Sequence, residues 1–346
     1  MAHKSQGNAM DWLRIDAAAE VEKICDRLRH ILSKSLKRRG LVVALSGGID
    51  SSVTLALSTR AVGADRVVAL LMPERHSADE TLSLSSRVAD HFGVEKIHED
   101  ISGILESVGF YRRYDAAVQS VIPGYGSGWK SKIVIPSVFA QKGFSLFSIV
   151  GQKPDGSQVK ERLPLKAYLA IVAATNFKQR TRKMLEYYHA DRLNYAVTGT
   201  PNRLEYDQGF FVKLGDGAAD VKPIAHLYKS QVYKLAEYLG VPEEIRRRPP
   251  TTDTYSLAQG QDEFYFSLPY DKMDICLYAK NHSLPANQAA EAAGLTPEQV
   301  QRVFEDIDTK RSTTRYLHMA PVLIDDVEEI QTVHGPRHTG HGEKVE

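Results

Sequence analysis

The fold is decided by the stretch Leu41-Val-Val-Ala-Leu-Ser-Gly-Gly-Ile-Asp-Ser-Ser52. Its first five residues are a continuous apolar run, which is typical of a strand buried on both faces. Two adjacent glycines follow, and residues 53–62 have a helical pattern. The sequence therefore predicts a strand, a glycine-rich turn and a helix in direct succession.

The turn has the chemistry of a phosphate site. Glycines let backbone amides approach an anion closely, and a helix N-terminus adds about half a positive charge. Hydroxyl donors come from Ser46, Ser51 and Ser52. Asp50 would repel phosphate unless a cation lay between the two, and Mg²⁺ is the natural bridge. The alternative is an ordinary turn capped by Ser and Asp. The turn is neither a Walker A loop nor a dinucleotide fingerprint.

Strands and helices alternate on both sides of this turn. The sequence predicts further strands at 67–72, 94–101 and 193–197, and helices at 12–39, 79–93, 165–189 and 228–239. Such alternation implies right-handed βαβ units. We therefore expect an α/β protein with a doubly wound parallel sheet and helices on both faces.

The composition is that of a globular protein. The 346 residues are 42% hydrophobic and 25% charged, so the chain can bury a full core. No run approaches the ~18 apolar residues of a membrane-spanning helix. A net charge of +1 predicts binding neither to nucleic acid nor to a membrane surface. Cys25 lies on the apolar face of its predicted helix and is expected in the core. Cys25 and Cys276 are the two cysteines of the sequence, too few for a disulfide framework, so we expect a cytoplasmic protein.

We divide the chain into four parts. They are an N-terminal lead with an amphipathic helix (1–40), the doubly wound domain (41–240), a C-terminal loop and helical extension that completes the site (241–330) and a disordered tail (331–346). Within the extension, helices are expected near 270–279 and 297–307.

The alternation breaks at about 110–163, which reads as an insertion with a hairpin. We expect it outside the parallel sheet, as a mobile cover or a docking surface near the phosphate site. The alternative is a decorative surface loop. Glycines at 124, 126 and 128 favour flexibility. Docking is favoured by aromatic residues that are costly to expose, namely Trp129, Phe139, Phe144 and Phe147.

The motif Ser46-Gly-Gly-x-Asp-Ser resembles the pyrophosphate loop of the ATP pyrophosphatases, whose fold is adenine nucleotide α-hydrolase-like. Further motifs follow, namely Gly199-Thr200-x(4)-Glu205, Phe210-Phe211, Gly215-Asp216-Gly-Ala-Ala-Asp220 and Leu227-Tyr-Lys229. Together they are similar to the motifs of the NAD synthetase family. The resemblance covers roughly residues 41–105 and 165–275.

Asn176-Phe-Lys-Gln-Arg180-Thr-Arg182 is similar to a family motif on the helix before the Gly-Thr strand. Arg180 and Arg182 cannot lie on one helical face, so at most one is expected to reach a ligand. The segment Tyr270-Asp271-x-x-Asp274 also resembles the family. Departures are Ala218 and Thr252, which stand where the family usually has glycine and alanine, and the region 110–163, which has no recognised counterpart in the short bacterial enzymes.

The resemblance implies a role for each of these residues. ATP would be bound by Ser46, Gly47, Gly48, Asp50, Ser51, Ser52, Thr200, Lys229 and Thr251. Mg²⁺ would be held by Asp50 and Glu205, and the nucleotide substrate by Asn176, Arg180, Asp216 and Asp220. Two of these would be catalytic, Lys229 by neutralising charge on the phosphates and Asp216 by capturing ammonium and helping to deprotonate it. For Asp216, a turn-forming role is the alternative. The start of the helix at Lys229 also suits phosphate.

The resemblance further implies the reaction. The nicotinate carboxylate of deamido-NAD attacks the α-phosphorus of ATP, pyrophosphate leaves, and ammonia then displaces AMP from the adenylate. The chain has no glutaminase arrangement, so we expect free ammonia or ammonia from a separate protein, and the family implies a homodimer.

Two other functions stay open. One is adenylation of nicotinate mononucleotide or of another carboxylate. The other is a non-catalytic nucleotide-binding regulator, although retention of both Asp50 and Glu205 argues against it.

Overall fold

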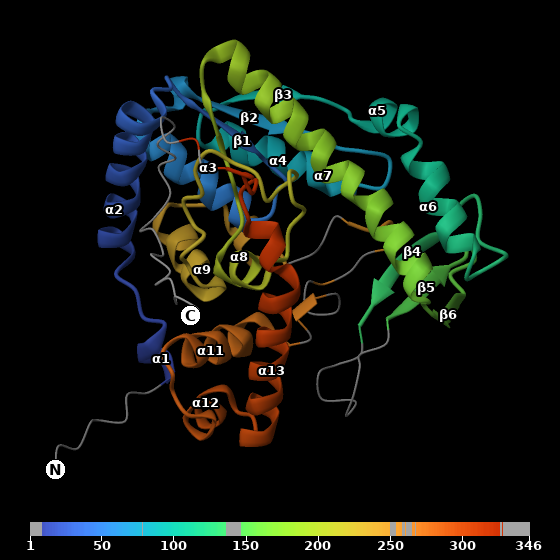
Figure 1. The fold of residues 1–346 in the computed structure, drawn as a ribbon. Helices are drawn as coiled ribbons and strands as arrows, with labels where there is room; N and C mark the ends of the chain where they lie inside the picture. The colour runs from blue at the N-terminus through green and yellow to red at the C-terminus, as the bar shows by residue number, and fades with distance from the viewer. Residues whose placement is uncertain are drawn as a thin grey trace.

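The computed structural model describes residues 9–77, 79–135, 147–249, 254–257, 260, 265–266, 268–325 and 327. The disorder expected for 331–346 and the ATP contact expected of Thr251 fall outside this part of the chain. Within it, the protein combines a parallel sheet flanked by helices, a small antiparallel sheet and a C-terminal group of helices (Figure 1).

The parallel sheet has the strand order β3-β2-β1-β7. Its strands are β1 (Leu41–Ala44), β2 (Val67–Leu71), β3 (Glu95–His98) and β7 (Ala196–Thr198). Val42 of β1 lies opposite Val68 on one side and Val197 on the other. The chain winds outward from β1 to β3 and later returns to β7. The strand order therefore switches between β1 and β7, where open α/β sheets bind ligands.

Helices cover both faces of this sheet. One face carries α2 (Ala17–His30), α3 (Ile49–Val62), α4 (Asp79–His91) and α9 (Lys229–Tyr238). The other carries α5 (Ser102–Ser107), α6 (Phe110–Gln119) and α7 (Leu165–Leu193). Val43 belongs to the first core and its neighbour Val42 to the second, because adjacent strand residues point to opposite faces. The predicted doubly wound sheet is confirmed.

The N-terminal helix differs from the prediction. Instead of one helix over 12–39, the chain forms α1 (Ala9–Trp12), α2 and a π-helical turn, η1 (Ile31–Leu36). Asp16 explains the break, since its carboxylate caps α2 by accepting a hydrogen bond from the amide of Ala19 at 3.1 Å. Cys25 is fully buried in α2, as expected.

Two strands are shorter than the apolar pattern predicts. β3 covers only 95–98 because it is the edge strand and most of its side chains are exposed. β7 begins only at Ala196 because α7 continues to Leu193. That helix ends at Asn194, whose φ of 57° is the left-handed conformation common after a helix.

The expected insertion contains a separate antiparallel sheet with the order β4-β5-β6. Its strands are β4 (Lys130–Val134), β5 (Ser148–Gln152) and β6 (Gln158–Arg162). The prediction that this segment stays outside the parallel sheet is confirmed, and Figure 1 shows the small sheet beside the start of α7. Ile133 and Ile149 are fully buried in the same core as α6 and α7.

The aromatic residues of the insertion divide into two groups. Trp129 and Phe147 are partly buried and pack against the core formed with α6 and α7. Phe139 and Phe144 lie outside the described residues. The described part of the insertion is therefore docked on the main body.

The C-terminal helices have a core of their own. They are α11 (Tyr270–Asn281), α12 (Ala286–Ala293), α13 (Pro297–Thr314) and η4 (Arg315–His318). Shorter helices elsewhere in the described residues are α8 (Arg203–Gln208), α10 (Glu243–Arg247) and η2 (Ala64–Arg66). Leu204 of α8 and Tyr228 before α9 both belong to this core. In Figure 1, α8 and α9 lie between the parallel sheet and α11–α13.

The predicted helices near 270–279 and 297–307 are confirmed by α11 and α13. None of the described helices combines the length and the apolar character needed to cross a membrane.

A cluster of buried hydroxyls ties α6 to the small sheet. The hydroxyl of Tyr114 lies 2.8 Å from Ser131 Oγ, which donates to the hydroxyl of Tyr125 at 3.1 Å. All three side chains are buried. Ser131 Oγ therefore joins the hydroxyl of Tyr114 on α6 to that of Tyr125.

Tyr114→Phe is expected to lower the free energy of unfolding by about 1–3 kcal/mol, because Ser131 then loses a partner in a dry site. Urea denaturation followed by circular dichroism measures the effect. Tyr188→Phe, an exposed position on α7, is the control and should change stability by less than about 0.5 kcal/mol. Equal effects of the two substitutions would mean that the hydroxyl cluster does not stabilise the docked sheet.

Candidate active site

The loop between β1 and α3 depends on its first glycine. Gly47 has a φ of 69°, and a Cβ there would lie 2.9 Å from the Cβ of Leu84, so other residues would be strained. Gly48 is the N-cap of α3. The hydroxyls of Ser51 and Ser52 donate to the carbonyl of Gly48 at 3.0 and 2.8 Å. These serines therefore also shape the loop, a role that the motif alone did not predict.

A cavity of about 950 Å³ lies at the carboxyl ends of β1, β2 and β7. Of the residues predicted from the sequence, it is lined by Ser46, Gly48, Asp50, Ser51, Asn176, Thr200, Glu205, Asp216 and Lys229. The predicted residues that are not part of its lining are Gly47, Ser52, Arg180 and Asp220. The fold thus gathers most of the predicted site at the point where the strand order switches.

Asp50 and Lys229 form a buried ion pair between the loop and α9. Lys229 Nζ contacts Asp50 Oδ2, and the two side chains are 1% and 16% exposed. Burial by itself lowers the pKa of Lys229, but the carboxylates of Asp50 and Glu205 outweigh burial and raise it. Lys229 therefore stays a cation in the cavity.

Asn202 joins the two predicted metal ligands. Its Nδ2 donates to Asp50 Oδ1 at 3.0 Å, and its backbone amide donates to Glu205 Oε2 at 3.1 Å. Its Oδ1 accepts hydrogen bonds from the amides of Leu204 and Glu205, which completes a capping box at the start of α8. Sequence reasoning missed Asn202, although the spacing Asn202-x-x-Glu205 is a capping-box signal.

The donor set of this cluster suits Mg²⁺. Burial and the neighbouring Asp50 carboxylate raise the pKa of Glu205 to about 8, because Lys229 offsets only part of their effect. Mg²⁺ commonly takes one or two carboxylates and fills its remaining positions with phosphate oxygens and water. The described residues contain no group of three or more His, Cys, Asp or Glu that could hold a metal. A cation at Asp50 and Glu205 would therefore depend on oxygens from a bound nucleotide.

The N-terminus of α9 is not available to phosphate, contrary to the prediction. The amides of Lys229 and Ser230 donate to the two carboxylate oxygens of Asp274, at 3.1 and 2.7 Å. Asp274 comes from α11 and is fully buried. Because an internal carboxylate already occupies the anion position, contact of Lys229 with phosphate must come from its side chain.

Asp216 lines the cavity next to a second ion pair. Its Oδ1 accepts a hydrogen bond from the amide of Val212 at 2.8 Å, so it has the turn-forming role as well. Lys183 Nζ lies 2.6 Å from Glu186 Oε2, and both residues are buried. Burial raises the pKa of Asp216 and of Glu186, which makes both carboxylates stronger proton acceptors. Sequence reasoning missed Lys183 and Glu186 because charged helix residues usually lie in solvent.

A further buried ion pair joins Lys178 of α7 to Glu74. Lys178, which lines the cavity, has its Nζ 2.7 Å from Glu74 Oε1, with side chains 2% and 0% exposed. The hydroxyl of Tyr111 donates to Glu74 Oε2 at 3.0 Å. Burial would raise the pKa of Glu74, but Lys178 outweighs burial and lowers it. This pair was also missed, since nothing local in the sequence signals a buried lysine.

The two arginines of α7 point to different surroundings. Arg182 lines the cavity and donates from Nε to the carbonyl of Met72 at 3.2 Å. Arg180 donates from Nε to the carbonyl of Lys213 at 3.3 Å and is not part of the lining. Of the two arginines, Arg182 therefore faces the cavity and Arg180, the one predicted to bind the substrate, does not.

Asp220 forms hydrogen bonds with β7 and α7. Its Oδ2 accepts a hydrogen bond from the amide of Val197 in β7 at 2.7 Å, and its Oδ1 accepts one from the hydroxyl of Tyr187 at 3.3 Å. These contacts hold the end of the Gly215–Asp220 motif against the sheet.

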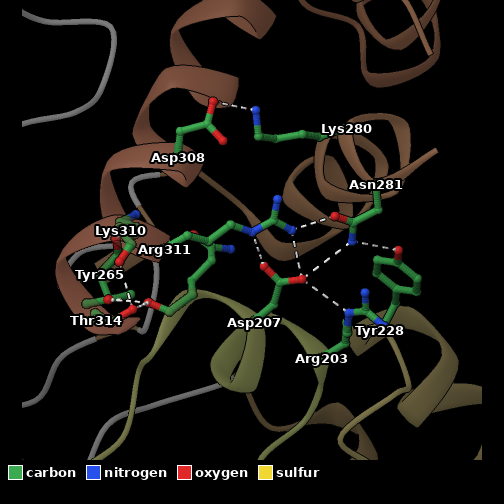
Figure 2. A network of polar contacts seen from close by, with 11 residues as sticks. Arg203, Asp207, Tyr228, Tyr265, Lys280, Asn281, Asp308, Lys310, Arg311 and Thr314 are labelled. Carbon is green, nitrogen blue, oxygen red and sulfur yellow. Dashed lines mark hydrogen bonds and ion pairs between the residues drawn. The ribbon is translucent and has the colours of Figure 1, made fainter. Parts of the chain in front are cut away.

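The C-terminal helices hold α8 through Asp207 (Figure 2). Arg311 donates to both carboxylate oxygens of Asp207 at 2.6 and 2.8 Å, and Arg203 lies 3.3 Å from Oδ2. Asn281 donates to the same carboxylate at 3.5 Å and accepts from Arg311. The helix that carries Glu205 is therefore fixed to α11 and α13.

A second cavity, of about 670 Å³, is lined by Arg203, Tyr206 and Asp207 of α8 and mainly by basic side chains. Its Arg203 and Arg311 pair with Asp207, and its His226 lies 2.7 Å from Glu20. These three basic groups are therefore already paired within the protein.

Solved structures share this fold. An NMN synthetase from Francisella tularensis superposes with a TM-score of 0.62 at 20% identity, covering 90% of this chain and 100% of the other. An NH3-dependent NAD synthetase from Campylobacter jejuni, in complex with nitrate, has a TM-score of 0.57 at 23% identity, with the same coverage. At these identities the likeness concerns the fold alone.

Sequence relatives are much more similar. The NH(3)-dependent NAD(+) synthetase of Rhizobium meliloti is 61% identical over 321 residues, covering 93% of this chain and 96% of the relative. That of Rhizobium rhizogenes is 60% identical over 317 residues, covering 92% and 96%. That of Thermotoga maritima is 33% identical over 293 residues, covering 84% and 94%.

A family model described as NAD synthase matches residues 20–121 and 156–315. The matched ranges include α6, so the internal segment that the family model leaves unmatched is shorter than the expected 110–163 and contains β4 and β5. Together with relatives of about 60% identity over more than nine-tenths of the chain, this match settles its relationship. The chain belongs to the NAD synthase family.

Proposed function

We propose that this protein makes NAD by ATP-dependent amidation of deamido-NAD with ammonia. The observation that carries the proposal is the cluster of Asp50, Asn202, Glu205 and Lys229 at the edge of a glycine-rich loop, in a chain about 60% identical to NH(3)-dependent NAD(+) synthetases. Such a cluster suits the handling of a triphosphate, since it combines a fixed cation with two carboxylates.

In the first half of the reaction, a carboxylate oxygen of deamido-NAD bonds to the α-phosphorus of ATP. The bond from that phosphorus to the bridging oxygen breaks, and its electron pair leaves with pyrophosphate. Two anions must meet for this to happen, so neutralisation and positioning carry the rate. The amides of the loop and the hydroxyl of Ser46 would hold the pyrophosphate, Thr200 and Thr251 the remaining phosphate or AMP oxygens, and Lys229 would neutralise charge on the phosphates.

Asp50 and Glu205 would hold Mg²⁺ together with the phosphates. When bound, Mg²⁺ supplies charge neutralisation for the triphosphate. Asn202 keeps the two carboxylates at a fixed separation through its hydrogen bonds to both. The chain's contribution is thus to present two carboxylates, joined by Asn202, to the cation.

In the second half, the nitrogen of ammonia bonds to the carbonyl carbon of the adenylate. The carbon–oxygen bond to AMP breaks with its electron pair on AMP, and nitrogen loses a proton. Asp216, whose pKa burial raises, would attract ammonium and accept a proton. Glu186, buried beside Lys183 in the same cavity, adds a second carboxylate of raised pKa.

The remaining assignments are part of the proposal. Asn176, which lines the cavity, would contact the nucleotide substrate, and Arg182 is better placed than Arg180 to do so. The contacts of Asp220 favour a supporting role for the same site. We further propose a homodimer that works in the cytoplasm and takes free ammonia or ammonia from a separate protein.

Asp50→Asn and Glu205→Gln should each lower turnover roughly 100-fold or more, because each removes charge that faces the phosphates. Stopped-time assays of NAD formation in saturating Mg²⁺, with melting curves of each variant, measure the effect. Glu237→Gln, an exposed position on α9, is the control. A variant that keeps near-normal turnover would remove that residue from the metal site.

Asn202→Ser should separate the two roles of Asn202. Serine retains an oxygen for capping α8 but is too short to reach Asp50, so turnover should fall roughly 10-fold while stability changes by only a few tenths of a kcal/mol. Asn202→Ala should lose turnover and also about 1 kcal/mol of stability. Normal turnover in Asn202→Ser would show that the contact with Asp50 is unimportant.

Ammonium salts should support NAD formation with a rate that rises with pH, since only the deprotonated amine has the lone pair that attacks. Glutamine alone should not support it. Pyrophosphate release, measured with ATP, Mg²⁺ and either deamido-NAD, nicotinate mononucleotide or no acid, tests the substrate. Release stimulated only by nicotinate mononucleotide, or by neither acid, would refute the proposed function.

A further inference from the structure

The first turn of α9 is held by a residue from another helix. A helix start leaves amides without partners inside the helix. At the N-cap position, the amide of Tyr228 donates to the side chain of Gln231 at 3.0 Å. The acceptor for the amides of Lys229 and Ser230 is instead the carboxylate of Asp274 on α11, at 3.1 and 2.7 Å.

Lys229 is therefore held at both ends. Asp274 fixes its backbone amide, and Asp50 receives its side-chain ammonium. Lys229 is 1% exposed and Asp274 is 0% exposed, so solvent does not substitute for either contact. A shift of the first turn of α9 would move the ammonium away from Asp50.

We propose that Asp274 is a positioning residue for Lys229, which it directs at Asp50 by accepting the first two amides of α9. The inference rests on the role proposed above for Lys229 in adenylation. Asp274 itself is not part of the cavity lining, so it acts through Lys229 and does not touch the reacting atoms.

The charge of Asp274 is suited to this task. An ionised carboxylate forms stronger hydrogen bonds with amides than a neutral group does, and it is favoured at the positive end of a helix. Burial raises the pKa of Asp274 to about 6, which leaves the group ionised at neutral pH. An asparagine would retain one acceptor and turn an N–H group toward the second amide.

Asp274→Asn tests the inference, with Asp271→Asn as the matched control on the exposed side of the same helix. The pyrophosphate burst with ATP, Mg²⁺ and deamido-NAD should slow roughly 10- to 100-fold in Asp274→Asn, because misplacement of a catalytic group has effects of this size. Acylation of Lys229 by N-hydroxysuccinimidyl acetate, followed by peptide mass spectrometry, should become faster. Asp271→Asn should match the parent in both measurements.

The Lys229→Ala background distinguishes positioning of Lys229 from a general structural role of Asp274. In that background, Asp274→Asn should have no further effect on the burst rate, because the two residues act through one contact. A burst that slows equally in the presence and absence of Lys229 would overturn the inference. So would a folded Asp274→Asn variant with parent-like acylation of Lys229.

The role of Lys229 can fail separately. Faster acylation of Lys229 with an unchanged burst would support its positioning by Asp274 and refute its proposed part in adenylation. If circular dichroism shows that Asp274→Asn is unfolded, Asp274→Ser, which keeps a smaller neutral acceptor, takes its place in each measurement with the same expected directions.

Discussion

The buried ion pair of Lys229 with Asp50 is the interaction on which the rest of the site depends. An ammonium and a carboxylate taken out of water are each destabilised by several kcal/mol, about as much as good pairing can return. Lys229 is compensated by Asp50 and Glu205, and Asp50 is compensated further by Asn202. Because loss of one member leaves a buried charge unmatched, the loop after β1, α8 and α9 must be placed together.

The C-terminal helices hold α8 and α9 in the positions that this ion pair requires. The sheet positions the loop, but α8 is a short helix whose Leu204 packs into the core of α11–α13. Arg311 fixes α8 through Asp207, and Asp274 fixes the start of α9. The segment that looks like an appendage in the sequence therefore holds both helices that bring Glu205 and Lys229 to the loop.

The charged residues of the cavity form two neighbouring groups. Asp50, Glu205 and Lys229 lie by the loop, whereas Asp216 is grouped with Lys183 and Glu186 of α7. The first group suits phosphates and a cation, and the second offers carboxylates of raised pKa to ammonium. Each half of the proposed reaction thus has its own polar group in one shared space.

By itself, the sequence determined the parallel sheet, the glycine loop and nine of the residues that line the cavity. The sheet and the loop follow from local spacing, since an apolar run, a Gly-Gly turn and a helix period are read within one segment. The other site residues follow from the resemblance of their motifs to those of NAD synthetases. Only the tertiary structure decided that Asn202 links Asp50 to Glu205, that Lys178 and Lys183 are buried as ion pairs, and that Asp274 reaches α9. The start of α9 shows the physical reason. A local pattern establishes that a helix end attracts an anion, but which anion fills it depends on the helix packed against it, and here that anion is a carboxylate 45 residues away from Lys229.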